Sequence, residues 1–115
     1  MKVYSMRLNA EPFALIERGE KSIELRLNDE KRQQLCVGDE IIFTHAQDGQ
    51  KTLRCKICAL HSFPNFQALY AALPLLQCGY TKDTVALAHP SDMEAYYSQE
   101  EQKKYGVLGI EIRVL

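Results

Sequence analysis

Three charged side chains in the N-terminal part of the chain have a spacing that suits a binding or catalytic site. They are Lys21, Glu24 and Arg26, in the stretch "GEKSIELRL" from Gly19 to Leu27. On a strand, Glu24 and Arg26 leave the same face, about 7 Å apart along the backbone. If that face is desolvated, the carboxylate needs a cationic partner, which Arg26 or Lys21 can supply. Spacing alone leaves three outcomes open: a solvated strand face, which is the commonest, an internal ion-pair network, or a site that binds a base edge or a phosphate.

Two further groups of side chains could extend such a site. Lys31 and Arg32 lie in a polar turn after the charged strand. They either remain solvated or rim a cleft and contact phosphate, as basic residues do in sites for single-stranded RNA. Tyr96 and Tyr97 either pack with their hydroxyls at the surface or offer a ring on which a base stacks. We expect one of the two tyrosines to belong to the site, and the sequence does not distinguish them.

The segment "CKICALH" has a spacing that suggests zinc, with Cys55, Cys58 and His61. Cys55 and Cys58 are an odd number of residues apart, however, so on a strand they face opposite sides. The two other cysteines, Cys36 and Cys78, have no matched spacing. Because a structural zinc site needs four convergent ligands, we predict no metal, and no pattern indicates a cofactor.

Hydrophobic periodicity predicts the elements that must position these residues. In residues 21–27 the aliphatic side chains fall on one strand face, and Glu24 and Arg26 fall on the other. Ser91 with Glu94, and likewise Ser98 with Glu101, have the spacing of helix capping boxes. The predicted strands are residues 2–9, 21–27, 36–45, 52–60 and 107–115, and the predicted helical segments are 10–20, 28–35, 65–73 and 91–106, with a loop and one short helix in 73–90.

These elements predict an α+β fold in a single domain, residues 1–115. Hydrophobic residues make up 46% of the chain and charged residues 25%, which is typical of a globular protein. A doubly wound parallel sheet would need more crossover helices than the pattern offers. Five or six short, mostly antiparallel strands instead favour a small β-barrel with short helices at its rim.

Charge and hydropathy narrow the class of partner. The formal net charge is -1, so the chain lacks the basic field expected of a protein that binds long duplex DNA. No apolar run suits a signal peptide or a membrane span. We therefore predict a cytoplasmic protein whose four cysteines are reduced thiols. The oligomeric state is not encoded in any pattern we can read.

Three stretches of the chain resemble the ASCH domain family, which is related to PUA-like RNA-binding domains. Gly19 to Leu27, with the pattern Gly-x-Lys-x-x-Glu-x-Arg, resembles the signature of the family. The following "RLNDEKRQQLCVGDEIIF" resembles its continuation through a Gly38–Asp39 turn into a barrel strand. The stretch "YYSQEEQKKYGVLGIEI" resembles the C-terminal segment of a bacterial branch. This resemblance spans essentially the whole chain and implies a PUA-like barrel whose cleft, lined by the signature residues, binds RNA, a nucleotide or a nucleoside.

The resemblance also raises the question of catalysis. Some small family members deacetylate N4-acetylcytidine with a lysine, a threonine and a glutamate, and a nuclease activity is associated with another member. Lys21 matches the lysine, but Glu24 stands at the position of the threonine. A carboxylate does not replace a hydroxyl nucleophile in acyl transfer, because it would form a mixed anhydride. If the protein is an enzyme, we predict that Glu24 activates water and that Lys21 and Arg26 stabilise the oxyanion.

Three functions therefore remain open at this point. The first is an RNA- or nucleotide-binding module that uses the cleft. The second is a small hydrolase in the same cleft, either an amidohydrolase acting on an acylated nucleoside or a ribonuclease, with Lys21 and Glu24 as its catalytic residues. The third is a protein-interaction domain in which the signature charges are purely structural.

Overall fold

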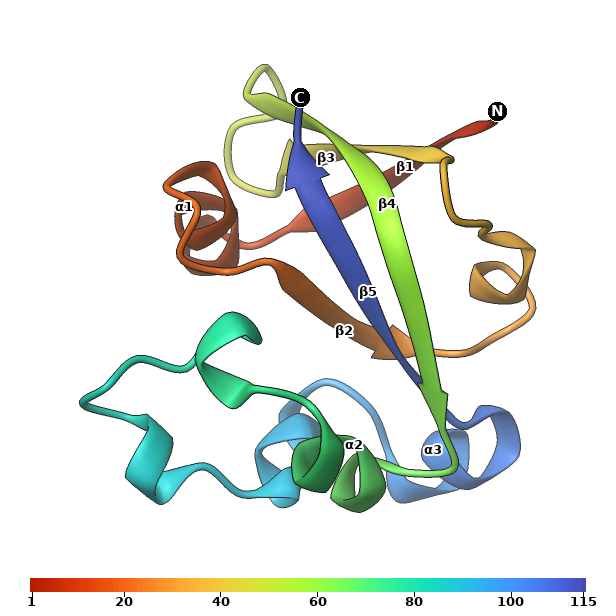
Figure 1. The fold of residues 1–115 in the computed structure, drawn as a ribbon, viewed down its shortest axis with the longest axis vertical. Coiled ribbons are helices and arrows are strands. Elements are labelled where there is room, and N and C mark those ends of the chain that lie inside the picture. The colour runs from red at the N-terminus through yellow and green to blue at the C-terminus, as the bar shows by residue number, and fades with distance from the viewer.

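Five strands and three α-helices account for most of the architecture in the computed structural model, which describes residues 1–115 (Figure 1). The strands are β1 (Val3–Leu8), β2 (Ile23–Leu27), β3 (Glu40–His45), β4 (Thr52–Phe63) and β5 (Val107–Val114). The α-helices are α1 (Ala10–Glu17), α2 (Phe66–Ala72) and α3 (Gln99–Tyr105). Short 3₁₀ turns cover Arg32–Gln34, Leu75–Gln77, Val85–Leu87 and Pro90–Ala95.

The strands form one sheet in the order β1-β3-β4-β5-β2, so β1 and β2 are its two edges. The pair of β1 and β3 is parallel, and the other three pairs are antiparallel. The sheet curls into a half-barrel, and α2, α3 and the 3₁₀ turns of residues 75–95 gather at one end of it (Figure 1). The predicted α+β class and barrel-like sheet are therefore confirmed.

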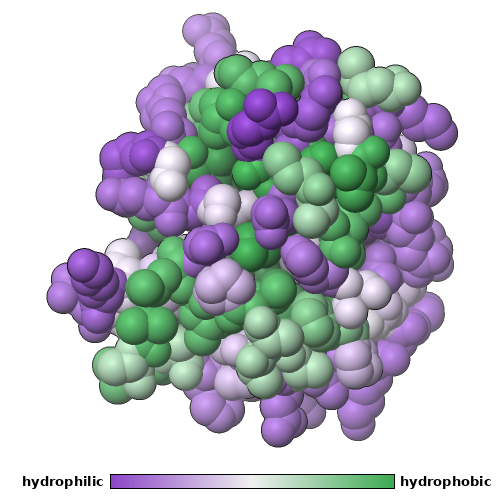
Figure 2. All heavy atoms as spheres, viewed as in Figure 1, coloured by the Kyte–Doolittle hydropathy of each residue, from purple (hydrophilic) through white to green (hydrophobic).

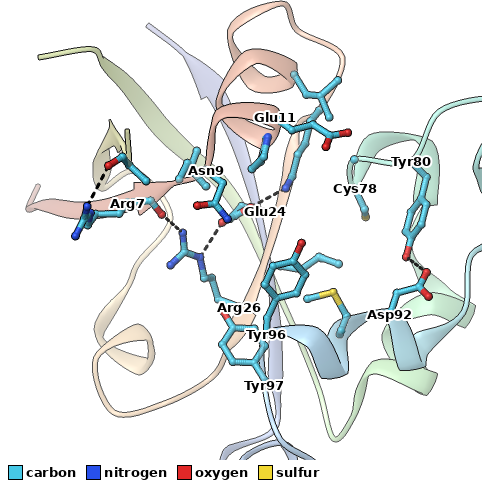
Figure 3. Close-up of a pocket in the computed structure, with 18 of the residues that line it drawn as sticks. Arg7, Asn9, Glu11, Glu24, Arg26, Cys78, Tyr80, Asp92, Tyr96 and Tyr97 are labelled. Carbon is cyan, nitrogen blue, oxygen red and sulfur yellow. Dashed lines mark hydrogen bonds and ion pairs between the residues drawn. The ribbon is translucent and has the colours of Figure 1, made fainter. Parts of the chain in front are cut away.

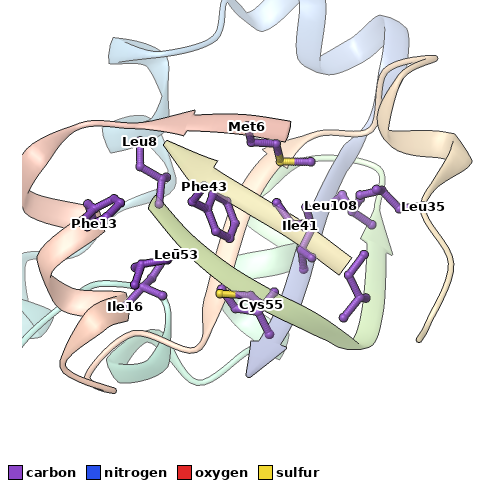
Figure 4. Close-up of a cluster of buried hydrophobic side chains, with 13 residues drawn as sticks. Met6, Leu8, Phe13, Ile16, Leu35, Ile41, Phe43, Leu53, Cys55 and Leu108 are labelled. Carbon is purple, nitrogen blue, oxygen red and sulfur yellow. The ribbon is translucent and has the colours of Figure 1, made fainter. Parts of the chain in front are cut away.

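The inside of the curl holds one hydrophobic cluster (Figure 4). Strand β1 contributes Met6 and Leu8, which alternate with exposed residues as its sequence pattern predicts. Phe13 and Ile16 of α1 close one end of the cluster, and Phe43 of β3 lies inside it. Burying a large apolar side chain of this kind stabilises the fold by roughly 1.5–3 kcal/mol. The cluster thus fixes β1 and α1, which form one side of the site described below.

A second hydrophobic cluster lies between β2, the start of β5 and the helical layer. Ile23, Leu25 and Leu27 of β2 all belong to it, together with Phe66 and Leu69 of α2. The predicted alternation of β2 is confirmed, because its aliphatic face is used by this cluster. Glu24 and Arg26 consequently leave the opposite face of the strand.

Close approach between β5 and the helical layer depends on a glycine. A Cβ atom on Gly109 would lie 2.7 Å from Cδ1 of Leu73 and 3.3 Å from Cγ2 of Ile23. A side chain at residue 109 would therefore require the Leu73 side chain to move away, so a glycine suits the close approach here.

The structure corrects two predictions about element boundaries. The capping box predicted for Ser91 and Glu94 is wrong: His89 occupies the cap position, and its side chain and that of Asp92 make the two reciprocal hydrogen bonds of a capping box. The prediction for Ser98 and Glu101 at the start of α3 is confirmed. Strand β4 continues beyond the predicted end at residue 60 to Phe63, with an irregularity between Ile57 and Ala59.

The cysteines and the helices bear on two further predictions. Cys55 is buried and Cys58 is exposed, in agreement with the expected opposite orientation on the strand. The structure holds no group of three His, Cys, Asp or Glu side chains arranged to bind a metal ion. None of its helices has the length and apolar character that crossing a membrane requires.

Candidate functional site

A cavity of about 690 Å³ lies beside the free edge of β2. One side is formed by the end of β1 and the start of α1, and the other by residues 70–97 of the helical layer. On the face of the molecule drawn in Figure 2, polar side chains lie between a hydrophobic area above and another below. The cavity is therefore placed between the half-barrel and the helical layer, at the only edge of β2 that no strand covers.

Glu24 is at the centre of the charged side of this cavity (Figure 3). Its Oε1 accepts a hydrogen bond from Nζ of Lys21 at 2.8 Å, and its Oε2 accepts one from Nε of Arg26 at 2.7 Å. Only 5% of Glu24 is exposed, and the side chains of Lys21 and Arg26 are 10% and 14% exposed. We call these three residues the charged wall. The three side chains that the sequence singled out thus converge, and they do so as a desolvated network rather than as a solvated face.

The environment keeps the Glu24 carboxylate ionised. Burial on its own would raise the pKa, but Coulombic attraction to Lys21 and Arg26 and the hydrogen bonds that both donate hold the pKa below its ordinary value of 4.5. Both carboxylate oxygens have cationic partners. A carboxylate that is ionised and accepts a hydrogen bond at each oxygen holds Lys21 and Arg26 in place. It is also a poor acceptor of a further proton at neutral pH.

Arg26 also connects the two edges of the sheet. Its Nη2 donates a hydrogen bond to the main-chain carbonyl of Arg7 at 2.8 Å. Arg26 belongs to β2 and Arg7 to β1, so the guanidinium bridges the gap that the half-barrel leaves open. With one nitrogen on Glu24 and another on Arg7, the planar group has a fixed orientation in the wall of the cavity.

The helical layer contributes a second polar group, which we call the tyrosine wall. The hydroxyls of Tyr70 and Tyr80 are 2.7 Å apart, and the Tyr80 hydroxyl donates to Oδ2 of Asp92 at 2.6 Å. Oδ2 also accepts a hydrogen bond from the N–H of His89 at 3.2 Å. Tyr80 and Asp92 lie across the cavity from Glu24 and Arg26 (Figure 3).

The hydrogen bonds of the tyrosine wall perturb the pKa values of its members. Burial, followed by the hydrogen bond to Asp92, raises the pKa of Tyr80 far above its ordinary value of 10.0. The hydrogen bond from Tyr80, with the one from the His89 N–H, lowers the pKa of Asp92 below 3.8. At neutral pH the wall therefore presents neutral tyrosines hydrogen-bonded to an ionised aspartate.

The side chain of Lys21 lies beside Cys78 and Gly79, and its end reaches Glu24. Gly79 has a φ of 111°, and a Cβ atom there would lie 3.5 Å from Cδ of Lys21. Cys78 is buried, and burial raises the pKa of its thiol to about 11, against the opposing effect of the Lys21 charge. The thiol is therefore protonated at neutral pH and is a poor nucleophile.

Comparison of the sequence with models of known families identifies the family of this chain. The ASCH domain family profile matches residues 6–115. This chain belongs to the ASCH domain family. The family is PUA-like, and its members are thought to bind RNA. No curated protein shows a significant match to the chain.

Several solved structures share the fold of this chain. The ASCH domain described here is similar to the hypothetical protein PH0355, with 31% identity, a TM-score of 0.80 and coverage of 98% of this chain and 99% of that one. It is also similar to protein PF0455 from Pyrococcus furiosus, with 31% identity, a TM-score of 0.73 and coverage of 98% and 97%. An ASCH domain from Lactobacillus crispatus shares 15% identity at a TM-score of 0.64, with coverage of 98% and 79%, which is a likeness of fold.

The structure separates the two tyrosines that the sequence could not. Both line the cavity of the ASCH domain. Tyr97 stacks against Phe66, with ring centroids 6.3 Å apart and an interplanar angle of 17°, and packs on the second hydrophobic cluster. Tyr96 is 67% exposed and touches Tyr97 only at a tilt, with ring centroids 6.5 Å apart, so most of its ring is accessible beside the cavity.

Lys31 and Arg32 lie outside the set of residues that line the cavity. Lys31 is exposed. Arg32 donates from Nη1 to Oδ2 of Asp29 at 3.2 Å, and the main-chain N–H of Arg32 donates to Oδ1 of the same residue. The aspartate thus holds Arg32 in its own turn, and the role predicted for the two basic residues at the rim stays a prediction.

The sequence analysis did not identify the residues that elements other than β2 contribute to the cavity lining. Arg7, Tyr70, Tyr80 and Asp92 all line it. Asp92 had a detectable signal, since it stands three residues after His89 and two after Pro90, the arrangement of a capped turn that begins with proline. The tyrosines had none, because only the tertiary fold brings α2 and the loop after it together.

Proposed function

We propose that the cavity binds one nucleotide unit, either as a free nucleoside or nucleotide or as part of single-stranded RNA. The observation that carries this proposal is that Lys21, Glu24 and Arg26 converge in the same cavity as the exposed ring of Tyr96. Fixed hydrogen-bond donors beside a free aromatic ring are what recognition of an unstacked base requires. A PUA-like family whose members are thought to bind RNA supports the same conclusion.

The charge of the cavity favours a small or weakly charged ligand over a long polyanion. Its lining holds three cationic and three anionic side chains, and their formal charges cancel: Arg7, Lys21 and Arg26 against Glu11, Glu24 and Asp92. A net charge of -1 for the whole chain adds no general attraction to phosphate. We therefore expect recognition of the base and sugar to contribute more than contacts with the phosphate backbone.

The geometry favours binding over hydrolysis in the same cavity. A general base must be free to accept a proton from water, whereas both oxygens of Glu24 are bonded to Lys21 and Arg26 and its pKa is lowered. Opposite Glu24, the Cys78 thiol is protonated at neutral pH. The charged wall is thus better suited to orienting donors towards a ligand than to activating a nucleophile.

A binding titration tests the proposal. Labelled single-stranded RNA oligomers and the four common nucleosides are titrated against the protein at low and moderate salt. Replacing Tyr96→Ala removes an exposed ring and leaves both clusters intact, and we expect about tenfold weaker binding from lost stacking. Lys31→Ala is the control, since it alters an exposed residue outside the cavity. If no RNA and no nucleoside binds, the proposal is wrong, and a protein-interaction role with structural charges replaces it.

An activity assay tests the hydrolytic alternative directly. The protein is incubated with N4-acetylcytidine, with other acylated nucleosides and with RNA, and we expect no turnover above background. Turnover that disappears in Lys21→Met and in Glu24→Gln would establish the hydrolase and would show that the Glu24 network opens during catalysis.

A further inference from the structure

The main chain of β2 carries an unused hydrogen-bonding pair at the floor of the cavity. On either side of β2, the C=O of Ser22 accepts a main-chain hydrogen bond from Ile112 of β5 at 2.8 Å, and the N–H of Asn28 donates one to Gly106, the residue before β5, at 3.0 Å. Bonded and non-bonded positions alternate along an antiparallel pair, so Glu24 and Arg26 are also bonded to β5. Leu25 falls between them, and its N–H and C=O therefore point away from β5.

No strand lies on that other side, because β2 is an edge of the sheet. The strand register turns the N–H and C=O of Leu25 away from β5, and no main-chain hydrogen bond outside the helices and strands involves them. Leu25 is only 7% exposed, yet it lines the cavity. Its side chain belongs to the second hydrophobic cluster, and its outward-turned N–H and C=O lie at the edge of β2 beside the cavity. Buried main-chain groups without a partner are rare, which makes this pair a candidate for bonds to a ligand.

The pair has the pattern of a base edge. In an extended residue, the N–H and the C=O lie side by side and point the same way, which is how two strands exchange two hydrogen bonds at one position. The hydrogen-bonding edges of nucleobases likewise place a donor beside an acceptor. One extended residue can therefore form two parallel hydrogen bonds with the edge of a flat ring.

We propose that the N–H and C=O of Leu25 recognise the hydrogen-bonding edge of an uncharged nucleobase, while Tyr96 covers its face. This inference rests on the proposed function and deepens it, because it names the main-chain groups that recognise the ligand. The ligand class is a planar ring with a donor next to an acceptor. Adenine, cytosine and uracil all qualify.

An added peptide strand is a poorer fit for the same edge. The Arg26 guanidinium crosses from β2 to the carbonyl of Arg7 and so blocks a strand that would extend along the whole edge. Of the three outward-pointing residues of β2, only Leu25 lines the cavity, and Ile23 and Leu27 do not. One accessible pair suits a single ring, whereas strand addition needs a run of such pairs.

Methylated nucleosides test the edge from the ligand side. Each nucleoside that binds is compared with an analogue whose edge is blocked and with one methylated elsewhere: uridine with 3-methyluridine and 5-methyluridine, cytidine with N4,N4-dimethylcytidine and 5-methylcytidine. We expect the blocked analogues to bind at least about tenfold more weakly, from the loss of hydrogen bonds. The 5-methyl analogues should bind as the parents do. Equal binding of blocked and parent nucleosides overturns the inference and leaves the proposed function standing.

A main-chain substitution tests the edge from the protein side. Replacing Leu25 by its α-hydroxy acid removes the N–H and keeps the side chain. The same replacement at Leu27 is the matched control, since it makes the same chemical change at an outward-pointing position that does not line the cavity. We expect the Leu25 ester to weaken nucleoside binding about five- to tenfold, and the Leu27 ester to leave binding unchanged.

Nuclear magnetic resonance supplies a readout that does not depend on a variant. In ¹⁵N-leucine-labelled protein, the Leu25 amide should shift downfield and exchange more slowly when the nucleoside is added, and the Leu27 amide should not. A Leu25 amide that stays unchanged while the nucleoside binds contradicts the inference. Binding of extended peptides with no response to nucleosides overturns both this inference and the proposed function.

Discussion

Glu24 and Asp92 are carboxylates on opposite sides of one cavity, and their surroundings differ. Glu24 is 5% exposed and held by two cations, whereas Asp92 is exposed and held by a tyrosine hydroxyl and a main-chain N–H. The pKa of each carboxyl group is lowered. For Glu24, burial alone would raise the pKa, and the charges of Lys21 and Arg26 outweigh it; for Asp92, hydrogen bonds lower the pKa. The charged wall is thus buried and stiff, and the tyrosine wall stands at the solvent boundary.

The difference suggests a division of labour between the two walls. Both carboxylate oxygens of Glu24 are bonded to Lys21 and Arg26, so the charged wall can supply orientation but has little freedom to rearrange. In the tyrosine wall, Oδ1 of Asp92 has no partner in the protein and can accept a bond from a ligand. The comparison predicts that damage to the charged wall costs more stability than damage to the tyrosine wall.

The largest expected effect comes from removing the carboxylate of the charged wall. Glu24→Ala leaves Lys21 and Arg26 desolvated without a counter-charge, so we expect the free energy of unfolding to fall by about 3–5 kcal/mol. Urea denaturation followed by circular dichroism measures it. The control is the triple variant Lys21→Met, Glu24→Leu, Arg26→Met, in which no charge is left unpaired and most of the loss should be recovered. A loss below about 1 kcal/mol for the single variant would mean that the wall is solvated and that the contrast with Asp92 is wrong.

A smaller loss is expected when the charge is kept and the shape of the group is changed. Arg26→Lys retains a cation for Glu24 but cannot also reach the Arg7 carbonyl, so the bridge between β2 and β1 is lost. We expect about 2 kcal/mol of destabilisation, the value of a charge-assisted hydrogen bond in a partly buried place. Thermal denaturation measures it, with Arg18→Lys as the control, because Arg18 pairs with Glu20 at the exposed surface. An equal effect at both positions would argue that the bridge contributes nothing.

The charged wall could be predicted from the sequence because it obeys a local rule. A strand with Ile23, Leu25 and Leu27 on one face must place Glu24 and Arg26 on the other, whatever the rest of the fold does. That these charges are buried did not follow from the pattern. Burial depends on the helical layer and on β1, which close over the strand only in the folded chain.

The tyrosine wall and the free N–H and C=O of Leu25 could not be predicted from local rules of this kind. Tyr70, Tyr80 and Asp92 come from a helix, an irregular segment and a 3₁₀ turn, with no shared period. The free pair of Leu25 depends on which β2 residues bond to β5, and this register is set by tertiary packing and not by the alternation of β2. Local patterns thus identify which residues share a face, while pairing and contact between distant segments decide what that face becomes.

The tyrosine wall should respond more weakly than the charged wall to the loss of a group. Tyr80→Phe removes the hydroxyl that donates to Asp92 and leaves the Tyr70 hydroxyl without its partner. We expect a loss of about 1 kcal/mol in unfolding free energy, as for a typical hydrogen bond, measured by urea denaturation. Tyr70→Phe keeps the bond between Tyr80 and Asp92 and should cost less. A loss for Tyr80→Phe that matches Glu24→Ala would show that both walls are equally important to stability.

The smallest expected effect is on the titration of Asp92. Its pKa in the folded protein lies below the ordinary 3.8, so the bonds to its carboxylate add stability above that pH and are lost as the pH falls through the lowered value. In Tyr80→Phe the larger cause is gone, and the pKa of Asp92 should rise towards 3.8 while the His89 N–H still holds it somewhat below. A ¹³C-carboxyl titration measures the pKa, and that of Glu24 should not move, because Lys21 and Arg26 hold it without any contact with Tyr80. If the two carboxyls shift together, the walls are coupled across the cavity, and a ligand held by one would change the proton affinity of the other.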